Sequence, residues 1–206
     1  LKGANRLTFE TALVREMRRR AQPYGNFHIY FQQSTLYIEP QDETCDMDGM
    51  YDCARKVFGI VAVNRAAVCD KTMESILTTA RTYLPGKMKN CRTFKVDARR
   101  ADKRFPLKSP EICAEVGAVI LEETHGKIRV DVHHPDAVIG VEVREEHAYL
   151  RASQEPGAGG LPIRTSGKGL LLLSGGIDSP VAGCMMAKRG MDIEALHQWI
   201  EENKLR

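Results

Sequence analysis

The feature that most constrains the fold is a short apolar run that leads into a glycine-containing turn and a helix. Residues 170–173 are four consecutive leucines, which is typical of a strand buried on both faces of a parallel sheet. The string SGGIDS follows at 174–179, a helix is predicted over 179–189, and a second strand over 192–197. This β-loop-α-β order predicts the opening of a doubly wound α/β domain.

The SGGIDS string has the properties of a phosphate-binding loop. Gly175 and Gly176 are expected to let the backbone turn sharply and approach a ligand closely. N–H groups of the loop and of the helix start converge on one spot, where the helix dipole favours phosphate. The hydroxyls of Ser174 and Ser179 can donate to phosphate oxygens, and Asp178 can help to hold magnesium or orient a reacting group. The lysine of the GxxxxGK[ST] loop is absent, and a plain glycine turn is the alternative.

Two further α/β units are predicted before this loop. The first has a helix, two strands, a helix and a strand, an order that lacks only a first strand of a ferredoxin-like unit. These elements are predicted over 5–20, 27–32, 35–39, 47–58 and 60–68. The second unit has two helices and four strands. They are predicted over 71–84 (ended by Pro85-Gly86), 92–98, 109–124 (with Ser109 as N-cap), 128–132, 138–144 and 147–151.

The expected fold class is therefore mixed α/β (α+β) in three parts. The predicted domains are 1–69, 70–152 and 170–206, with a glycine- and proline-rich linker over 153–169. No stretch of about 18 apolar residues suggests a membrane span, and a cytoplasmic location is expected. None of the six cysteines forms a CxxC pair, so mostly buried reduced thiols are expected rather than a protein-held metal site.

Positive charge is concentrated in two stretches although the net charge is only +3. Residues 91–108 hold seven Lys/Arg against two Asp, and the first twenty residues hold six against two acids. Local stretches of this kind suit a polyanion, and a solvated helix face or loop is the equally good alternative. Phe105 is a candidate to stack on a base, with core packing as the more frequent role.

Several strings in this sequence resemble known domains. SGGIDS resembles the PP-loop of ATP pyrophosphatases, and the segment from FKVDARRADKRFPLKSPEI to VDVHHPDAVIGVEVREEHAYL is similar to a THUMP domain. Together with LLLLSGGIDSPVAG, the preceding GGLP and SGKG, and IEALH, they resemble the tRNA 4-thiouridine synthase (tRNA sulfurtransferase, ThiI) family up to about His197. The resemblance implies a ferredoxin-like domain, a THUMP domain and the start of a PP-loop domain.

The resemblance also implies a function. The family uses ATP and Mg²⁺ to adenylate the uridine at position eight of tRNA, and a persulfide sulfur from a cysteine desulfurase then displaces AMP. The implied ATP-site residues are Leu172, Leu173, Ser174, Gly175, Gly176, Ile177, Asp178, Ser179 and His197, with Asp178 as the catalytic candidate. The residues expected to hold the acceptor stem and 3′ end of tRNA are Arg99, Arg100, Lys103, Arg104 and Lys108, with Lys2 and Arg6 as weaker candidates.

The sequence departs from this pattern at several points. Arg164 stands where the family usually has glycine, Cys184 is expected to be an inert buried thiol of the helix, and 198–206 suggests a short polar helix unlike the family. The chain is expected to be incomplete, inactive alone, a weak ATP binder, and prone to dimerise through exposed strand edges. Two rival functions are a non-catalytic tRNA-binding module with an inert PP-loop, and a PP-loop enzyme acting on a small amide or acid.

Overall fold

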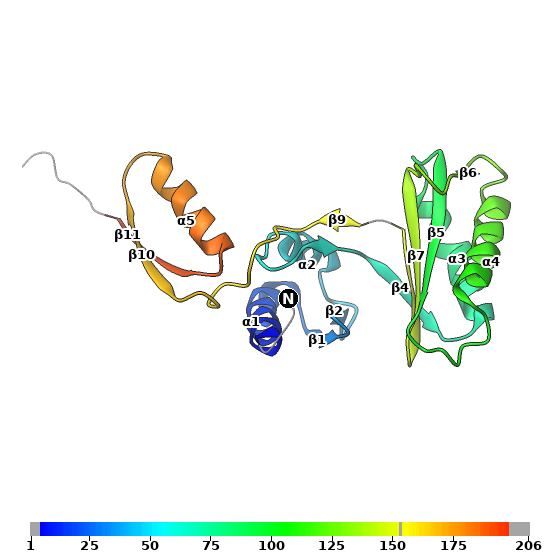
Figure 1. The fold of residues 1–206 in the computed structure, drawn as a ribbon, viewed down its shortest axis with the longest axis horizontal. Coiled ribbons are helices and arrows are strands. Elements are labelled where there is room, and N and C mark those ends of the chain that lie inside the picture. Colours follow the sequence, from blue (N-terminus) through cyan, green and yellow to red (C-terminus); the bar gives the residue numbers. More distant parts are fainter. Residues whose placement is uncertain (1–4, 153, 198–206) are drawn as a thin grey trace, which may run out of the picture. The chain divides into compact units, whose positions relative to one another are not determined.

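The computed structural model describes residues 5–152 and 154–197, and these fall into two compact units. The first unit comprises Leu1–Val63 and Glu155–Arg206, and the second comprises Asn64–Gln154. The chain thus leaves the first unit at 64 and returns to it at 155. Figure 1 shows the elements in sequence colours, in which the second unit runs from cyan through green to yellow.

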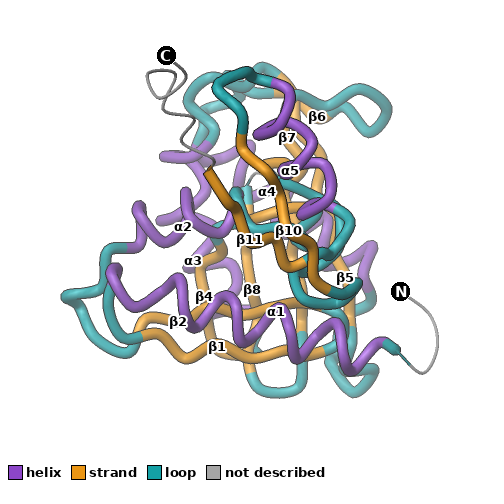
Figure 2. Tube along the Cα trace, turned by 90° about the vertical axis from the view of Figure 1, so that its left-hand side faces the viewer, coloured by secondary structure: helices purple, strands orange, loops and turns teal. Residues whose placement is uncertain are grey.

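The N-terminal part of the first unit is a helical layer on a two-stranded sheet. Its elements are α1 (Arg6–Ala21), the 3-10 turn η1 (Gln22–Tyr24), β1 (Phe27–Gln32), β2 (Thr35–Pro40) and α2 (Met47–Arg55). β1 and β2 form an antiparallel hairpin whose turn residues Gln33 and Ser34 have φ of 48° and 67°, values that match the right-handed twist of the strands. Leu13 and Met17 of α1 pack with Ile29 in this core, and Figure 2 shows α1 beside the hairpin.

The strand predicted over 60–68 is wrong, because two short strands occupy this region. β3 (Ala62–Val63) pairs antiparallel with β9 (Glu155–Pro156) in the first unit. β4 (Ala66–Asp70) pairs antiparallel with β8 (His147–Arg151) in the second. The second unit therefore begins before the expected boundary at 69/70, and the expected linker over 153–169 contains a paired strand. Neither long-range pairing leaves a sign in the local pattern.

The second unit is a five-stranded mixed sheet with two helices packed on it. The strand order is β4-β8-β7-β5-β6, in which β5 is parallel to both β6 and β7. The remaining bounds are α3 (Met73–Lys87), β5 (Thr93–Arg100), α4 (Ser109–Glu123), β6 (Arg129–Val130) and β7 (Ala137–Val143). Ile76, Ile112 and Ile139 lie in one core that joins both helices to the sheet. β6 is the edge strand beside β5, as Figure 1 shows.

Two helix termini in this unit differ from the predictions. α3 continues through Pro85 to Lys87, since a proline in the last turn removes only one hydrogen bond near an end that frays. The N-cap of α4 is Lys108 rather than Ser109, and the Glu111 carboxylate accepts from the Lys108 backbone N–H. Pro110 lies within the first turn as expected.

The C-terminal part of the first unit is the predicted β-loop-α-β segment. β10 (Lys168–Leu173) and β11 (Asp192–His197) are paired in parallel, and α5 (Asp178–Lys188) connects them. α5 approaches β10 closely at Gly183, where an added Cβ would come within 2.5 Å of Leu171 Cδ2. Figure 2 shows the two strands side by side. A small residue at this position is what allows the helix to lie near the strand.

Candidate nucleotide and nucleic-acid sites

The SGGIDS loop connects the carboxyl end of β10 to the start of α5. The Ser179 hydroxyl accepts a hydrogen bond from the Ser174 backbone N–H at 3.2 Å, and the two hydroxyl oxygens lie 3.3 Å apart. These contacts close the loop across its mouth. The N-cap residue of α5 is Ile177, which gives the helix no side-chain cap. The N–H groups at the start of α5 are therefore presented outward without a capping carboxylate or hydroxyl from the N-cap.

Positive φ is not the reason for the two loop glycines. Neither Gly175 nor Gly176 is among the glycines with positive φ, so the turn itself does not need glycine here. An added Cβ at Gly175 would meet nothing within 4 Å, and one at Gly176 would meet only the Ser174 hydroxyl at 3.7 Å. The space beside both glycines is open. Close approach of a ligand is the remaining physical reason for two residues without side chains.

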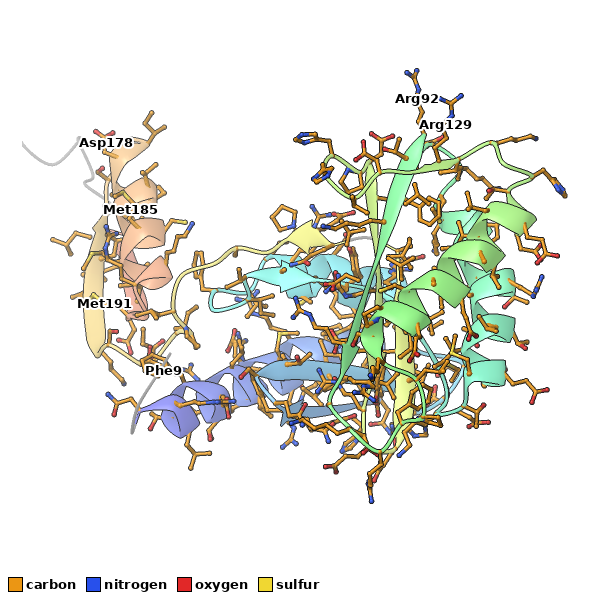
Figure 3. The ribbon with its side chains drawn as sticks, turned by 45° about the vertical axis from the view of Figure 1, so that its right-hand side comes forward. Phe9, Arg92, Arg129, Asp178, Met185 and Met191 are labelled. Atoms are coloured by element: carbon orange, nitrogen blue, oxygen red, sulfur yellow. The ribbon has the colours of Figure 1, made fainter. Side chains whose placement is uncertain are left out.

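The strand ends place the other expected ATP-site residues beside this loop. Leu173 and His197 are register partners at the ends of β10 and β11, and Leu172 pairs with Leu196. Ligands of open α/β sheets bind beyond the carboxyl ends of parallel strands. Asp178, the first residue of α5, is exposed, and Figure 3 shows its side chain at the end of the helix. Ile177 is 82% exposed, which leaves the loop accessible.

The apolar run of β10 is not buried on both faces as predicted. Leu170 and Leu172 are 65% and 60% exposed, whereas Leu171 and Leu173 are half-buried. The sheet has two strands here, and α5 lies on the side of Leu171. The face with Leu170 and Leu172 has no covering layer among the described residues. Leu196 of β11 is also exposed.

The basic segment 99–108 is largely paired within itself. Arg104 donates to both carboxylate oxygens of Asp102, at 3.0 and 3.2 Å. Arg100 donates to the carbonyl oxygen of Phe105 at 2.9 Å, and Arg99 lies 3.5 Å from the Asp97 carboxylate. These contacts shape the loop, and two of the three place a carboxylate beside an arginine.

Lys103 and Lys108 are the exposed cations of this segment that form no salt bridge within the described chain. Arg6 donates to Glu10 and to the Ser34 hydroxyl, which ties α1 to the hairpin turn. Lys2 lies outside the described residues. The structure thus divides the expected nucleic-acid residues into paired arginines with a structural contact and two lysines available to a ligand.

Asp102 organises the loop that carries these cations. Besides Arg104, it accepts from Lys71 Nζ at 2.9 Å, and Lys71 also donates to the Glu145 carbonyl at 2.7 Å. The Arg104 side chain and backbone N–H, together with Lys71, hold the pKa of Asp102 well below its usual range. Sequence reasoning missed Lys71, because a contact across 31 residues leaves no local signal.

Burial decides between the two roles expected for Phe105 and contradicts the expectation for Cys184. Phe105 is 5% exposed and packs in the core of the second unit, which is the more frequent of its two expected roles, so its ring is not available for stacking on a base. Cys184 is exposed rather than buried, because the face of α5 toward β10 is built on Gly183. The other five cysteines are half-buried rather than mostly buried. The backbone N–H groups of His133 and His134 donate to the Asp131 carboxylate.

The described residues contain no group of three or more His, Cys, Asp or Glu side chains able to hold a metal ion. A magnesium ion commonly takes one or two carboxylates and the substrate phosphates, so Asp178 alone fits such an ion only as one ligand among several. No helix in the same part of the chain is long and apolar enough to cross a membrane.

Family models match the chain in three consecutive segments. Residues 1–64 match a ThiI ferredoxin-like domain, 70–151 a THUMP domain, and 164–204 the thiamine biosynthesis protein (ThiI). The order and the two ThiI-specific models decide the assignment. The chain belongs to the ThiI family. The described residues supply the fold that these matches require: a hairpin with helices, a five-stranded sheet, and a β-loop-α-β segment.

Curated ThiI relatives cover almost the whole chain. The chain is 42% identical over 199 residues to a probable tRNA sulfurtransferase of Alkaliphilus metalliredigens, covering 96% of this chain and 50% of the relative. It is 44% identical over 200 residues to a probable tRNA sulfurtransferase of Moorella thermoacetica, covering 96% and 49%. The chain spans about half the length of the curated relatives it matches.

Two solved structures share the fold. One is a crystal structure of a 4-thiouridine synthetase-RNA complex with bound ATP, with a TM-score of 0.82, 38% identity, and coverage of 96% of this chain and 49% of that chain. The other is PH1313 from Pyrococcus horikoshii, with a TM-score of 0.83, 29% identity, and coverage of 94% and 65%. The mixed α/β fold class expected from the sequence is confirmed.

Proposed function

We propose that this chain provides the tRNA-binding part and the nucleotide-binding loop of a tRNA sulfurtransferase that forms 4-thiouridine. The observation that carries the proposal is the exposed SGGIDS loop at the carboxyl end of β10, in a chain that also contains a THUMP domain. The similar structure with RNA and ATP supports this pairing of ligands. A PP-loop enzyme that acts on a small amide or acid would not need the THUMP domain to bind its substrate.

The loop residues would act on the nucleotide by positioning and charge neutralisation. N–H groups of the loop and of the start of α5 would donate to phosphate oxygens, with the Ser174 and Ser179 hydroxyls beside them. The backbone at Leu172 and Leu173, and His197 at the end of β11, would border the base. Asp178 would hold Mg²⁺ together with the phosphates, and the bound ion would neutralise charge that develops on them.

The five-stranded unit would hold the acceptor stem and 3′ end of tRNA. Lys103 and Lys108 would contact phosphates directly, while Arg99, Arg100 and Arg104 would contribute through the shape of their loop and their residual charge. Arg6 and Lys2 would add weaker contacts from the first unit. We further propose a cytoplasmic location, a cysteine desulfurase as sulfur donor, and a homodimer that covers the exposed face of β10.

The tRNA role is tested by fluorescence anisotropy of labelled tRNA with the 206-residue chain across a salt series. Binding that weakens steeply with salt and needs the single-stranded 3′ end is expected. A second tRNA that lacks this end is the matched control. Equal binding of the two RNAs, or none, would contradict the proposed recognition of the acceptor end.

The nucleotide role is tested by Gly175→Val. A Cβ at Gly175 would meet no atom within 4 Å, so the variant is expected to fold normally. Its valine side chain would occupy the space that a bound phosphate needs. NMR titration with Mg-ATP at millimolar concentration detects even weak binding by the wild-type chain. We expect ATP to change the chemical shifts of residues around the loop in the wild-type chain and to leave them unchanged in the variant. Identical titrations of the two proteins would contradict an ATP site here, and would favour a tRNA-binding module with an inert loop.

A further inference from the structure

Arg92 and Arg129 lie next to each other at the end of the sheet opposite to the basic segment 99–108. Arg92 immediately precedes β5, whose carboxyl end carries Arg99 and Arg100. Thr93 is the register partner of Arg129, and the Arg129 N–H donates to the Arg92 carbonyl at 2.9 Å. Figure 3 shows both side chains pointing away from this end of the sheet. Parallel pairing, not sequence proximity, brings them together.

Both guanidinium groups are exposed, and neither forms a salt bridge or side-chain hydrogen bond in the described chain. This contrasts with Arg99, Arg100 and Arg104, whose side chains have partners within the fold. Two neighbouring cations repel each other, and a bound anion would remove that repulsion. Exposed basic side chains also lie in the segments that flank these arginines, at Lys89, Lys127, His133 and His134.

Asp131 and Asp136, two acids close to these arginines in the chain or in the sheet, accept hydrogen bonds from the backbone. Asp136 accepts from the N–H groups of Arg92 and Thr93 at 2.8 and 3.0 Å. Asp131 accepts from the N–H groups of His133 and His134, both at 2.9 Å. These bonds lower the pKa of both carboxyls, and the Arg92 charge is the smallest of the causes at Asp136. The carboxylates therefore shape the turns and offset the surrounding positive charge only in part.

We propose that this end of the sheet, centred on Arg92 and Arg129, is a second phosphate-binding surface for the same RNA that the 99–108 segment contacts. Planar guanidinium forks bind phosphate oxygens in pairs, and two of them on neighbouring strand residues can contact separate phosphates of one backbone. The inference rests on the proposed tRNA-binding function and extends it: the RNA contacts both ends of β5. These contacts give affinity and orientation rather than sequence specificity.

The test compares two double variants of the 206-residue chain that remove equal charge from the two ends of β5. These are Arg92→Gln/Arg129→Gln and Lys103→Gln/Lys108→Gln, each titrated into labelled tRNA from low to high salt. For the first pair, affinity is expected to fall roughly tenfold near physiological salt, and the slope of log K against log salt to fall by about two. Its thermal unfolding midpoint should be unchanged or slightly higher, because two unpaired like charges are removed.

Each outcome separates the inference from the proposed function. If only the lysine pair weakens binding, the second surface is wrong and the tRNA-binding function stands. If Arg92→Gln/Arg129→Gln lowers both the affinity and the salt slope while the fold is intact, the second surface is supported. If the wild-type chain binds no tRNA, the proposed function fails and this inference fails with it.

Discussion

The Lys71 ammonium and the Asp102 carboxylate are joined at 2.9 Å across 31 residues of sequence. This ion pair links the start of α3 to the loop that carries the basic segment, because Asp102 also receives two bonds from the Arg104 side chain. The side chain of Asp102 is 6% exposed, so an unpaired charge would be unfavourable there. The loop geometry therefore depends on Asp102 remaining ionised.

Stability should depend on this carboxylate in acid. Arg104 and Lys71 depress the folded-state pKa of Asp102. The ionised carboxylate therefore adds to the free energy of unfolding above its unfolded-state pKa of about 4, and this stabilisation is lost as the pH falls below that value. Asp102→Asn should lower the thermal midpoint at neutral pH and flatten its decline in acid, measured by circular dichroism. Asp97→Asn, which alters a looser pair at 3.5 Å, is the control. If the thermal midpoints of wild type and Asp102→Asn fell equally with decreasing pH, ionised Asp102 would not be the source of the acid sensitivity.

Phe105 should matter for folding and not for RNA stacking. It is buried in the core of the second unit, so Phe105→Ala is expected to cost about 3–5 kcal/mol in the free energy of unfolding. Phe105→Leu should cost less than about 1.5 kcal/mol and leave tRNA affinity within about twofold. Urea unfolding measures the free energy of unfolding, and fluorescence anisotropy measures the tRNA affinity. A large loss of RNA affinity in a stable Phe105→Leu protein would restore the stacking role.

The contact between Gly183 and Leu171 should limit side-chain size on α5. Gly183→Ala gains about 1 kcal/mol of helix propensity but must displace the flexible Leu171 side chain, so a net change near zero is expected. Gly183→Val should destabilise the segment by about 1–3 kcal/mol. Ala182→Val, on the exposed side of α5, is the control. Hydrogen exchange of the β10 amides measures the local stability of this segment. Equal exchange rates in Gly183→Val and Ala182→Val would argue against close packing of α5 on β10.

Arg164 occupies a backbone conformation that suits glycine. Its φ is 73°, and its side chain pairs with Asp192 at 3.1 Å on the surface. Arg164→Gly should relieve about 1 kcal/mol of backbone strain and lose an exposed pair worth less than that, so the protein should be equally or slightly more stable. Gly190→Ala, with φ of 92° at the native residue, should have the opposite effect. Thermal unfolding compares the two, and a destabilised Arg164→Gly protein would mean that the ion pair dominates.

The exposed leucines of β10 should promote self-association. Leu170 and Leu172 are both more than half exposed on the face away from α5, and an uncovered apolar strand face of this kind favours association. Leu170→Lys/Leu172→Lys should therefore shift the chain toward monomer in sedimentation velocity. Leu7→Lys, which changes a 73% exposed leucine on α1, is the control. An unchanged distribution in the β10 variant would place any self-association elsewhere.

Local patterns alone predicted most elements and the position of the SGGIDS loop between β10 and α5. The helix over 109–124, the hairpin strands and the strand over 192–197 follow from periodicity, turn residues and caps, which act between near neighbours. The SGGIDS string was recognisable for the same reason: its chemistry lies within six consecutive residues. The family resemblance, which the domain matches confirm, rests on such strings.

Tertiary structure decided what depends on pairing between distant segments. It split the strand predicted over 60–68 between two sheets, since β3 and β4 take partners about 90 and 80 residues away. It buried Phe105, exposed Cys184 and one face of the leucine run, and placed Arg92 beside Arg129. Burial and charge neutralisation depend on which surfaces meet in three dimensions. The sequence therefore determined the elements and the motif, and the packed structure determined which side chains remain available to a ligand.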